Sequence, residues 1–573
     1  MIERVKWISS LEKVFPDKEP GLRAGDGAVS LGREAAGLSG TALSVPEAVP
    51  CFLEGEVFSL QCAFLTGRDA EGWAEVTISG PFAEYAAVRE VCPVPCRFAG
   101  TALADGQEQV YAPGLYPDLL KELRDNRIRL YPGQWQGLWI TIKCGGQESG
   151  RELPVGIHEL ELTLTPDQGE PVKESLKLEL MPAGLPEQKL IHTEWFHTDC
   201  LADYYRVEPW SEAHWSIVEK FLMHYGAMGM NMVLVPVFTP PLDTAVGRER
   251  TTVQLVDVWE EDGGSWSFGF ERVERYVELC RQAGIRYLEI AHLFTQWGAR
   301  CAPKVMVRRG GVQVRRFGWD TASDSPEYLG FLEQFLKAFT GKLSQWGYEG
   351  RAFFHLSDEP GGEETLKRYG FLREKVTGWI APYPLMDALS DYSFYETGAV
   401  DYAVPSMNSL PLFAEKGASP LWTYYCGAHS EGTPNRYIAM PASQVRVLGV
   451  LLYVYQVEGF LHWGYNFYNS QYSLEHIDPY AVTDAGGAFP SGDSYLVYPG
   501  EGGRPEDSQR MLLMLEAMQD LRALQLLESL WGRDRVLELI RSEAGEELTA
   551  KRWPRDPGFL LRLREKVNRA VSV

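Results

Sequence analysis

The sequence predicts a multidomain protein in which an N-terminal all-β sandwich precedes a (β/α)8 barrel and a C-terminal helical segment. Three observations predict this order. Short β-rich runs fill residues 1–187, apolar strands alternate with amphipathic helices over 188–505, and charged helical sequence fills 506–573. A chain of 573 residues, 45% of them hydrophobic, is long enough for two or three domains with full cores.

The first 187 residues have the pattern of an all-β domain. Alternating or β-branched runs occur at 73–79, 135–144 and 158–166, with Gly, Pro and Asp between them. A two-sheet sandwich is the natural architecture for such a segment. The strongest helical signal here is PDLLKELRD (117–125), and MPAGLPEQK (181–189) has the composition of a linker.

Two helices of the second region carry their own start signals. Ser211 is a plausible N-cap, and the helix after it places its apolar residues on one face: Trp215, Val218, Phe221, Leu222 and Tyr225. Ser325 precedes a second helix with Pro326 at its first position, and the buried stripe there is Leu329, Leu332, Leu336, Phe339 and Leu343.

Short apolar runs between such helices predict eight strands, at 190–197, 231–238, 285–292, 352–358, 383–390, 401–408, 420–426 and 459–466. Eight parallel strands with intervening helices are typical of a (β/α)8 barrel. The later segments contain little helix, so we expect a distorted barrel. The helical tail from about residue 505 is expected to pack against it.

Composition limits the partners. The net charge of −23 repels phosphate backbones and anionic lipid surfaces, so we expect neither nucleic acid nor a membrane as partner. No run approaches the 18 apolar residues of a membrane span, and the N-terminal segment has no apolar region of signal-peptide length. We therefore expect a cytoplasmic protein.

The nine cysteines are scattered, and their odd number and low density indicate reduced thiols. CPVPC (92–96) is the one close pair, and no second pair stands at zinc spacing. We expect no metal and no cofactor.

Barrel enzymes carry their active sites at the carboxyl ends of the strands. Here those positions hold aromatic residues mixed with carboxylates, imidazoles and amides, which suit a sugar with one apolar face and a ring of hydroxyls. The residues predicted to bind substrate are Trp195, His197, Asp199, His292, Trp297, His355, Asp387, Asn408, Trp422, Tyr424, His462, Trp463, Tyr465 and Asn466.

The run FFHLSDEP (353–360) predicts the catalytic residues. Asp358 and Glu359 end a buried strand, and Pro360 forces the break that lets both face one pocket. Glycosidic cleavage normally needs two carboxyl groups on opposite sides of the bond, but LWTYYC (421–426) at the seventh strand has none. A substrate whose own acetamido group is the nucleophile removes that need, and a carboxylate beside the acid then steadies the amide.

Several blocks resemble one family. HLSDEP (355–360), the run 436–467 and PSGDSYLVYPG (490–500) resemble glycoside hydrolase family 123, the β-N-acetylgalactosaminidases and their uncharacterised bacterial relatives. WFHTDCLADYY (195–205) and HLFTQWGA (292–299) are also similar to segments of these proteins. The resemblance covers roughly residues 190–530.

The resemblance implies an exo-acting retaining hydrolase that releases β-linked N-acetylgalactosamine with help from the substrate's acetamido group. It implies that Glu359 is the general acid/base and that Asp358 orients and stabilises the acetamido group. Tyr424 and Tyr465 are both candidates for a hydrogen bond to the amide oxygen. Members of this kind are commonly exported, whereas the expectation here is a cytoplasmic enzyme acting on short oligosaccharides rather than glycolipids.

Rival hypotheses remain. A two-carboxylate glycosidase could use Asp387 opposite Glu359 on a sugar without an acetamido group. A non-catalytic carbohydrate-binding barrel is the second alternative, and a hydrolase of another polymer is the third.

Overall fold

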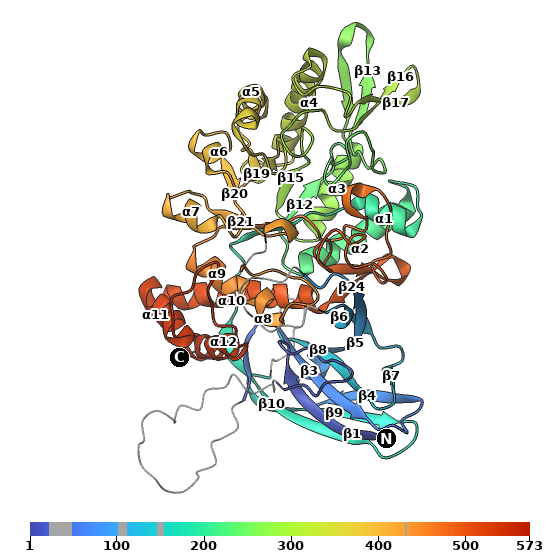
Figure 1. Ribbon diagram of the computed structural model, residues 1–573, viewed down its shortest axis with the longest axis vertical. Coiled ribbons are helices and arrows are strands. Elements are labelled where there is room, and N and C mark those ends of the chain that lie inside the picture. The colour runs from blue at the N-terminus through green and yellow to red at the C-terminus, as the bar shows by residue number, and fades with distance from the viewer. Residues whose placement is uncertain (22–48, 101–111, 146–153, 430–431, 573) are drawn as a thin grey trace.

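The computed structural model describes residues 1–21, 49–100, 112–145, 154–429 and 432–572. It has a mixed α/β fold, with a β-rich N-terminal region, a region of helices and parallel strands, and a group of C-terminal helices (Figure 1). None of the helices in these ranges is long and apolar enough to cross a membrane.

Two sheets form the N-terminal region. One has five strands in the order β2 (Cys51–Glu54), β10 (Val172–Gly184), β9 (Gly156–Pro166), β4 (Trp73–Ser79) and β7 (Arg127–Arg129). The other has seven, in the order β1 (Ile2–Ser9), β3 (Val57–Thr66), β8 (Trp135–Lys143), β5 (Ala86–Cys96), β6 (Gly114–Glu122), β24 (Pro505–Ser508) and β23 (Val497–Pro499). Alternate residues of β9, such as Leu160 and Leu162, share one apolar cluster with Leu138 and Ile140 of β8, as in two sheets packed face to face.

The structure resolves two local patterns in this region. Residues 117–125, which carry the strongest helical signal of the predicted all-β region, lie mostly in strand β6, which pairs antiparallel with β5. The predicted linker at 181–189 begins inside strand β10. Pairing with a neighbouring strand outweighs the local helical pattern of residues 117–125. Strands β23 and β24 also extend the N-terminal sheet, although the sequence places them at the far end of the second region.

All eight predicted strands of the second region are present, each within its predicted range. Six form one parallel sheet, in the order β18 (Ala352–Phe354), β15 (Tyr287–Ile290), β12 (Met232–Val235), β11 (Ile191–Glu194), β22 (Gly459–His462) and β21 (Trp422–Tyr424). β19 (Met386–Ala388) and β20 (Tyr402–Val404) form a parallel pair. Isolated parallel bridges join Phe354 to Leu385 and Ser406 to Tyr424.

Helices follow most of these strands: α1 (Thr198–Tyr205), α2 (Glu212–Ala227), α3 (Glu271–Gln282), α4 (Pro326–Gln345), α5 (Glu363–Ile380), α6 (Tyr392–Glu396), α7 (Leu410–Glu415), α8 (Ala442–Arg446) and α9 (Leu448–Val454). Ser211 caps α2 as predicted, because its hydroxyl accepts from the backbone N–H of His214 at 3.3 Å. Ser325 precedes α4, with Pro326 at its first position, but its side chain makes no capping hydrogen bond. The helices from α6 to α9 are short, as the sequence predicts.

A small sheet that the sequence analysis did not predict interrupts this pattern. Its order is β14 (Trp266–Gly269), β13 (Asp257–Glu260), β16 (Val305–Arg309) and β17 (Val312–Phe317), and its hairpins project at the top of Figure 1. Within the described ranges there are also five short 3-10 turns: η1 (Ala83–Tyr85), η2 (Asp262–Gly264), η3 (Gly427–His429), η4 (Gln471–Ser473) and η5 (Glu501–Gly503).

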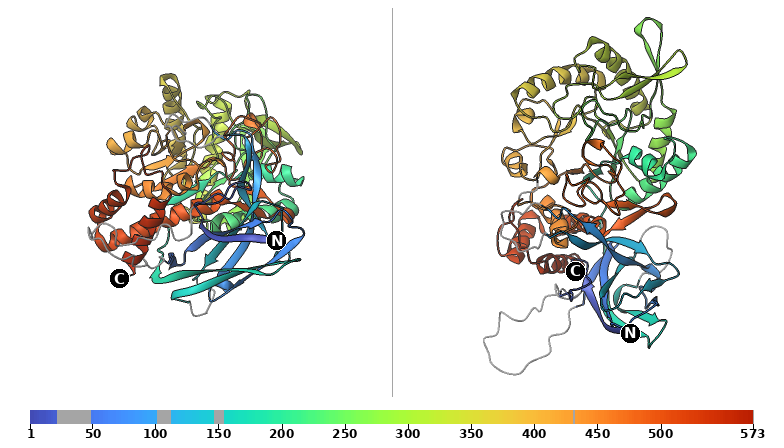
Figure 2. Two further views of the ribbon diagram at one scale, coloured as in Figure 1. Left: turned by 60° about the horizontal axis from the view of Figure 1, so that its bottom comes forward. Right: turned by 45° about the vertical axis from the view of Figure 1, so that its right-hand side comes forward.

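The C-terminal helices are α10 (Gln509–Trp531), α11 (Arg533–Ala544) and α12 (Gly558–Val571). Figure 2 shows them in red beside the blue N-terminal sheets. Helix α10 is buried over most of its length and contacts α8, α9 and α12 as well as β6. It therefore joins the two larger regions into one packed body.

Candidate active site

A cavity of about 230 Å³ lies where the parallel strands end at their carboxyl termini. Of the residues predicted for the site, seven line it: Trp195, His197, Trp297, Asp358, Glu359, Tyr424 and Trp463. Trp297 is the most exposed of these aromatic residues, at 46%, and it contacts Tyr472 edge to face at the rim. The cavity thus combines aromatic walls with adjacent carboxylates.

Asp358 and Glu359 follow strand β18 on a backbone that turns into the cavity. Glu359 has a φ of 42°, a left-handed conformation that is unusual for a residue other than glycine. Two hydrogen bonds hold this turn: Trp297 N–H donates to the Asp358 carbonyl at 2.9 Å, and Glu359 N–H donates to the Ala388 carbonyl at 3.0 Å. Strand β18 ends at Phe354, so the strand breaks before Asp358 and not at the position predicted from Pro360. Asp358 and Glu359 are both half-buried in the cavity wall.

Tyr424 stands at the end of the seventh strand, where the sequence offers no carboxylate. Its hydroxyl donates to Oε1 of Glu359 at 2.5 Å. Burial and the charge of Glu359 raise the pKa of Tyr424 well above its usual value. The phenol therefore keeps its proton and holds the Glu359 carboxyl in place.

The environment of Asp358 favours its protonated form. Burial raises its pKa well above the usual value, and the charges of Glu359 and Asp387 act in the same direction. Two neighbouring carboxyl groups bind a shared proton more readily than isolated ones. Such a pair can supply an acid at neutral pH.

Asp387 lies behind the cavity wall instead of in it. It is fully buried and accepts hydrogen bonds from His355 Nδ1 at 2.8 Å, from the N–H groups of Leu356 and Ser357 at 3.2 Å, and from the Tyr369 hydroxyl. Those two N–H groups belong to the segment that leads into Asp358. Asp387 therefore anchors the catalytic loop from behind.

His355 connects Asp387 to a second buried carboxylate. Its Nε2 lies 2.6 Å from Oε1 of Glu289, which also accepts from Trp195 Nε1 at 2.6 Å. Burial opposes a charge on His355, but hydrogen bonds to Asp387 and Glu289 raise its pKa to about 10. His355 is therefore an imidazolium that donates to both carboxylates. This chain of hydrogen bonds ends at Trp195 in the cavity wall.

His292 stacks on His355 with ring centroids 4.3 Å apart, and it also lies behind the wall. His292, His355 and Asp387 offer ligand atoms within 4.8 Å of one another, close enough to consider a metal. Both ring nitrogens of His355 already face carboxylates, at 2.8 Å from Asp387 Oδ1 and 2.6 Å from Glu289 Oε1.

His197 reaches the cavity with support from a buried ion pair. Asp199 binds the Arg250 guanidinium through two contacts of 2.7 Å, and Arg250 Nη2 donates to His197 Nδ1 at 3.0 Å. Burial and the Arg250 charge lower the pKa of His197 to about 3. The neutral ring therefore donates from Nε2 to the Trp463 carbonyl, at 2.8 Å. Asp199 acts one step away from the cavity, through Arg250.

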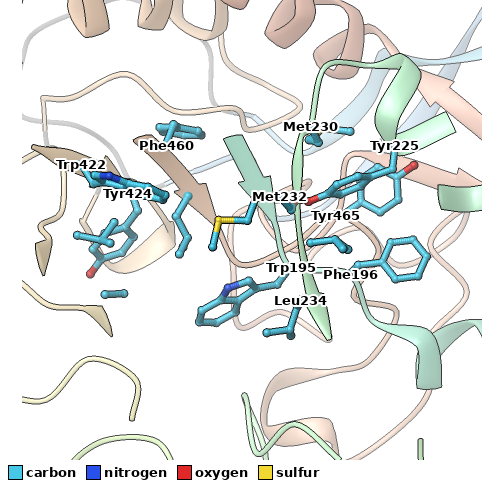
Figure 3. Close-up of a cluster of buried hydrophobic side chains, with 14 of the residues drawn as sticks. Trp195, Phe196, Tyr225, Met230, Met232, Leu234, Trp422, Tyr424, Phe460 and Tyr465 are labelled. Carbon is cyan, nitrogen blue, oxygen red and sulfur yellow. Dashed lines mark hydrogen bonds between the residues drawn. The ribbon is translucent and has the colours of Figure 1, made fainter. Parts of the chain in front are cut away.

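The remaining predicted residues lie outside the cavity. Trp422 is the first residue of β21 and lines a different cavity, at the amino ends of the parallel strands, so the structure does not place it at the predicted rim. Tyr465 packs between Phe196 and Tyr225 (Figure 3), and its hydroxyl lies 2.8 Å from His224 Nδ1. Trp422 is fully buried, and the side chains that do not line the cavity are Asp199, His292, His355, Asp387, Asn408, Trp422, His462, Tyr465 and Asn466. Their direct contact with substrate stays a prediction.

Several cavity residues were missed by the sequence analysis. They are Asp243, Gln296, Phe467, Gln471, Phe489 and Asp493. Gln296 follows the third predicted strand, which is a usable signal. Asp243 and Asp493 come from loops that fold back over the strand ends, and burial raises the pKa of each to about 6. Asp493 lies in PSGDSYLVYPG (490–500), one of the blocks of the family resemblance, whereas no local pattern marks Asp243.

Comparisons with known proteins identify the family of the chain. A family model described as the catalytic domain of glycoside hydrolase 123 matches residues 195–527. A structure of a family 123 glycoside hydrolase from Clostridium perfringens, described in terms of glycolipid glycan hydrolysis, is similar to the whole chain. It has a TM-score of 0.70 and 15% identity, and the match covers 100% of this chain and 98% of that one.

Other matches are weaker. A Bacteroides ovatus GH5 xyloglucanase has a TM-score of 0.32 at 10% identity, covering 82% of this chain and 97% of that one. A GH113 β-mannanase from Alicyclobacillus acidocaldarius has a TM-score of 0.29 at 12% identity, and the match covers 59% of this chain and 98% of that one. No curated protein sequence matches the chain.

The family model spans more than half of the chain and includes the Asp358–Glu359 pair, the aromatic rim and the loops that carry Asp243 and Asp493. This protein belongs to glycoside hydrolase family 123.

Proposed function

We propose that this chain is an exo-acting retaining glycoside hydrolase that releases terminal β-linked N-acetylgalactosamine by substrate-assisted catalysis. The observation that carries the proposal is the placement of two adjacent carboxyl groups, Asp358 and Glu359, in the wall of one cavity. Trp297 and Trp463 line the same cavity, and aromatic faces suit the apolar side of a sugar ring. Membership of family 123 supports the hydrolase class.

In the first step, the acetamido oxygen of the substrate attacks the anomeric carbon. Glu359 donates its proton to the glycosidic oxygen as the bond between carbon and oxygen breaks, and the aglycone leaves as an alcohol. In the second step, Glu359 takes a proton from water while the water oxygen attacks the same carbon, and the oxazolinium ring reopens to the acetamide. Two inversions at one carbon give net retention.

Asp358 would accept a hydrogen bond from the substrate's amide N–H and offset the positive charge of the oxazolinium. Burial and the Glu359 charge raise the pKa of Asp358 in the free enzyme. The positive charge that develops on the ring acts in the opposite direction and favours the carboxylate. Asp358 thus interacts more strongly with the transition state than with the substrate, which is the condition for catalysis.

Tyr424 is the better candidate of the two tyrosines for a role beside the acetamido group. It lines the cavity and holds Glu359. The Tyr465 hydroxyl already contacts His224, outside the cavity.

The two-carboxylate alternative with Asp387 has less support. Asp387 is fully buried, and its oxygens already accept from His355, Tyr369 and two backbone N–H groups. A nucleophile or base needs access to the anomeric carbon or to water. A purely carbohydrate-binding barrel would not need an acid held by a tyrosine.

We also propose that the eight parallel strands close into one distorted (β/α)8 barrel. The bridges from Phe354 to Leu385 and from Ser406 to Tyr424 support closure, because they join the two-stranded sheet to both edges of the six-stranded one. The domain limits of 1–187, 188–505 and 506–573 and the cytoplasmic location are proposed with it. The nine cysteines are free thiols, in keeping with a reducing compartment.

The proposed substrates are short oligosaccharides and glycoconjugates that end in this sugar. Glycolipid glycans are included, because the Clostridium perfringens relative is described with them.

The test is a panel of aryl β-glycosides of N-acetylgalactosamine, N-acetylglucosamine, galactose and glucose. We expect turnover of the acetamido sugars alone, with kcat/KM about 10²- to 10⁴-fold lower in Glu359→Gln and Asp358→Asn. Glu364→Gln, at an exposed position on α5, is the matched control. Turnover of plain hexosides that survives Asp358→Asn would overturn the proposal.

A further inference from the structure

One buried carboxylate, that of Glu289, accepts hydrogen bonds from three side chains. Trp195 Nε1 and His355 Nε2 both donate to Oε1, each at 2.6 Å, and the Thr193 hydroxyl donates to Oε2 at 2.6 Å. All four residues are buried, and none is more than 2% exposed. A carboxylate with both oxygens engaged in this way has a fixed position, and it fixes the position of its donors in turn.

The donors come from strands that are not neighbours of one another. Thr193 lies in β11 and Trp195 follows it, whereas Glu289 lies in β15 and His355 follows β18. In the sheet, β12 separates β11 from β15. Because Trp195 also lines the cavity, Glu289 joins the cavity wall to β18, the strand that leads into the catalytic loop.

The charge of Glu289 is balanced by a histidine. Among the described residues, no lysine or arginine forms an ion pair with Glu289 or Asp387, and His355 lies between the two. Burial opposes a charge on His355, but hydrogen bonds to Asp387 and Glu289 raise its pKa to about 10. The other titratable groups near this ring are His292, which burial and the His355 charge keep neutral, and Asp358.

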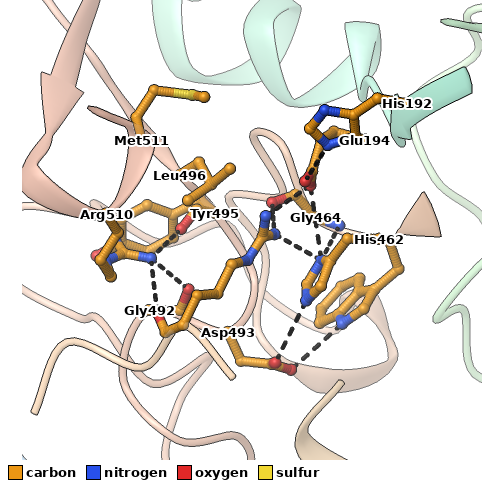
Figure 4. Close-up of polar contacts among 12 residues, drawn as sticks. His192, Glu194, His462, Gly464, Gly492, Asp493, Tyr495, Leu496, Arg510 and Met511 are labelled. Carbon is orange, nitrogen blue, oxygen red and sulfur yellow. Dashed lines mark hydrogen bonds and ion pairs between the residues drawn. The ribbon is translucent and has the colours of Figure 1, made fainter. Parts of the chain in front are cut away.

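A second buried carboxylate has a different counter-charge. Glu194 accepts from the Arg436 guanidinium at 2.6 Å, and its other oxygen lies 3.1 Å from His192 Nε2 (Figure 4). A guanidinium is not deprotonated in proteins, so the counter-charge of Glu194 is permanent. The counter-charge of Glu289 exists only while both ring nitrogens of His355 carry a proton.

From these contacts we propose that Glu289 is a positioning residue for the reaction, because it keeps His355 charged and thereby holds the catalytic loop in place. Asp387 accepts from His355 on the far side of the ring and from two backbone N–H groups of that loop. A neutral His355 can donate to only one of the two carboxylates, which leaves the other as a buried charge without a counter-charge. The reaction concerned rests on the proposed function, whereas the contacts of Glu289 stand by themselves.

Glu289→Gln tests the charge with little change in shape. The amide oxygen can accept from Trp195 and His355 as Oε1 does now, and the amide NH2 can donate to the Thr193 hydroxyl. The variant therefore keeps the hydrogen bonds but removes one of the two negative charges that hold the second proton on His355. Loss of such a charge lowers the pKa of a histidine by about one to three pH units.

The first readout is the ratio of kcat in the parent to kcat in Glu289→Gln, in which pH effects common to both proteins cancel. As pH rises, His355 loses its second proton first in the variant. We expect a ratio near one at about pH 5, where His355 is charged in both proteins, and a ratio of about 10- to 100-fold at about pH 9. A ratio that does not change with pH would indicate a merely structural role and would overturn the proposal.

Glu516→Gln is the matched control for this measurement. Glu516 is also a buried carboxylate, but it lies on α10 and does not line the cavity. Its substitution should give a kcat ratio that stays constant over the same pH range. A ratio that rises with pH in this control as well would contradict a specific role for Glu289.

A second readout does not depend on turnover. The chain has ten histidines, so labelling of their ring nitrogens gives a simple NMR spectrum. An ordinary histidine has a pKa of about 6.5, so we expect the parent to show an imidazolium signal at about pH 9 that Glu289→Gln lacks. A signal that persists in the variant would overturn the proposal. Absence of the signal from the parent would overturn it even if the variant does not fold.

The two readouts also separate this proposal from the proposed function. If the parent turns over none of the aryl glycosides, the proposed hydrolase fails, while loss of the imidazolium signal in Glu289→Gln would still support control of His355 by Glu289. If the parent turns over the acetamido sugars and the kcat ratio does not change with pH, the hydrolase stands and the role of Glu289 fails.

Discussion

Asp358 and Glu359 depend on a loop whose backbone is held from several sides. Glu359 has a φ of 42° and Trp297 a φ of 57°. Both residues therefore have a left-handed backbone conformation that residues other than glycine rarely adopt. Such strain persists where surrounding contacts fix it, and it is common at functional sites. Asp387 supplies one of those contacts, because it accepts the N–H groups of Leu356 and Ser357 just before the pair.

We therefore predict that Asp387→Asn lowers kcat by about 10- to 100-fold while leaving measurable activity, as is usual for residues that orient catalytic groups. The Asp387 charge also raises the pKa of Asp358. Its removal should lower that pKa and shift the acidic limb of the pH–rate profile to lower pH. The measurement is the pH dependence of kcat and kcat/KM.

Asp401→Asn is the control for this variant. Asp401 accepts from the Leu385 N–H at 2.8 Å next to the same strand pair but does not line the cavity, and its loss should leave the pH profile unchanged. If Asp387 were instead a second catalytic carboxylate, Asp387→Asn would abolish turnover and added azide or formate would restore it.

At the level of single residues, the sequence predicts the parts of the site that lie at strand ends. Asp358, Glu359 and Tyr424 end buried apolar runs, so their positions follow from a local pattern. Asp493 lies in a loop that reaches the cavity through tertiary contacts. Arg250 lies behind the cavity wall and donates a hydrogen bond to His197. Those contacts cannot be read from spacing along the chain.

Among the helices and strands, the fully buried strands were predicted best. Every residue of β12 is buried, and such continuous apolar runs mark strands covered on both faces. Strand β6 was missed because PDLLKELRD has a helical pattern, while its pairing partners are distant in sequence. The small sheet of β13, β14, β16 and β17 was missed because its short strands interrupt the alternation of parallel strands and helices.

Helix α2 offers a test at this scale. Ser211 accepts the His214 N–H, whereas Ser325 makes no capping bond at the start of α4. Ser211→Ala should lower the free energy of unfolding by about 1 kcal/mol. Ser325→Ala is the matched control and should lower the free energy of unfolding by clearly less. Urea or thermal unfolding of both variants measures the two losses. Equal losses would contradict the assigned cap.

In the whole molecule, a buried ion network joins regions that are far apart in sequence. Arg446 of α8 contacts Glu516 and Asp520 of α10, and Arg564 of α12 contacts Asp520 and Glu56. Removal of one partner from such a network leaves an uncompensated buried charge. The network therefore makes the N-terminal sheets, the parallel strands and the C-terminal helices depend on one another.

This network predicts a pH dependence of stability. Burial raises the pKa of Glu516 from 4.5 to about 7. Between these values the folded chain binds more protons than the unfolded one, so this group's contribution to stability falls as pH rises. The loss amounts to about 3 kcal/mol over that window.

Glu516→Gln should remove this slope, so the difference in unfolding free energy between the variant and the parent should change steadily from pH 4.5 to 7. Denaturant unfolding across that range measures the difference. A constant difference would contradict a raised pKa for Glu516.

The central claim is that the substrate supplies its own nucleophile while Asp358 and Glu359 act from one strand end. The most direct test compares kcat for aryl β-galactosaminides with N-acetyl, N-fluoroacetyl and N-trifluoroacetyl groups. Fluorine withdraws electrons from the amide oxygen, so the claim predicts a steep fall in kcat along the series. A flat series, with the same kcat for all three substrates, would contradict it.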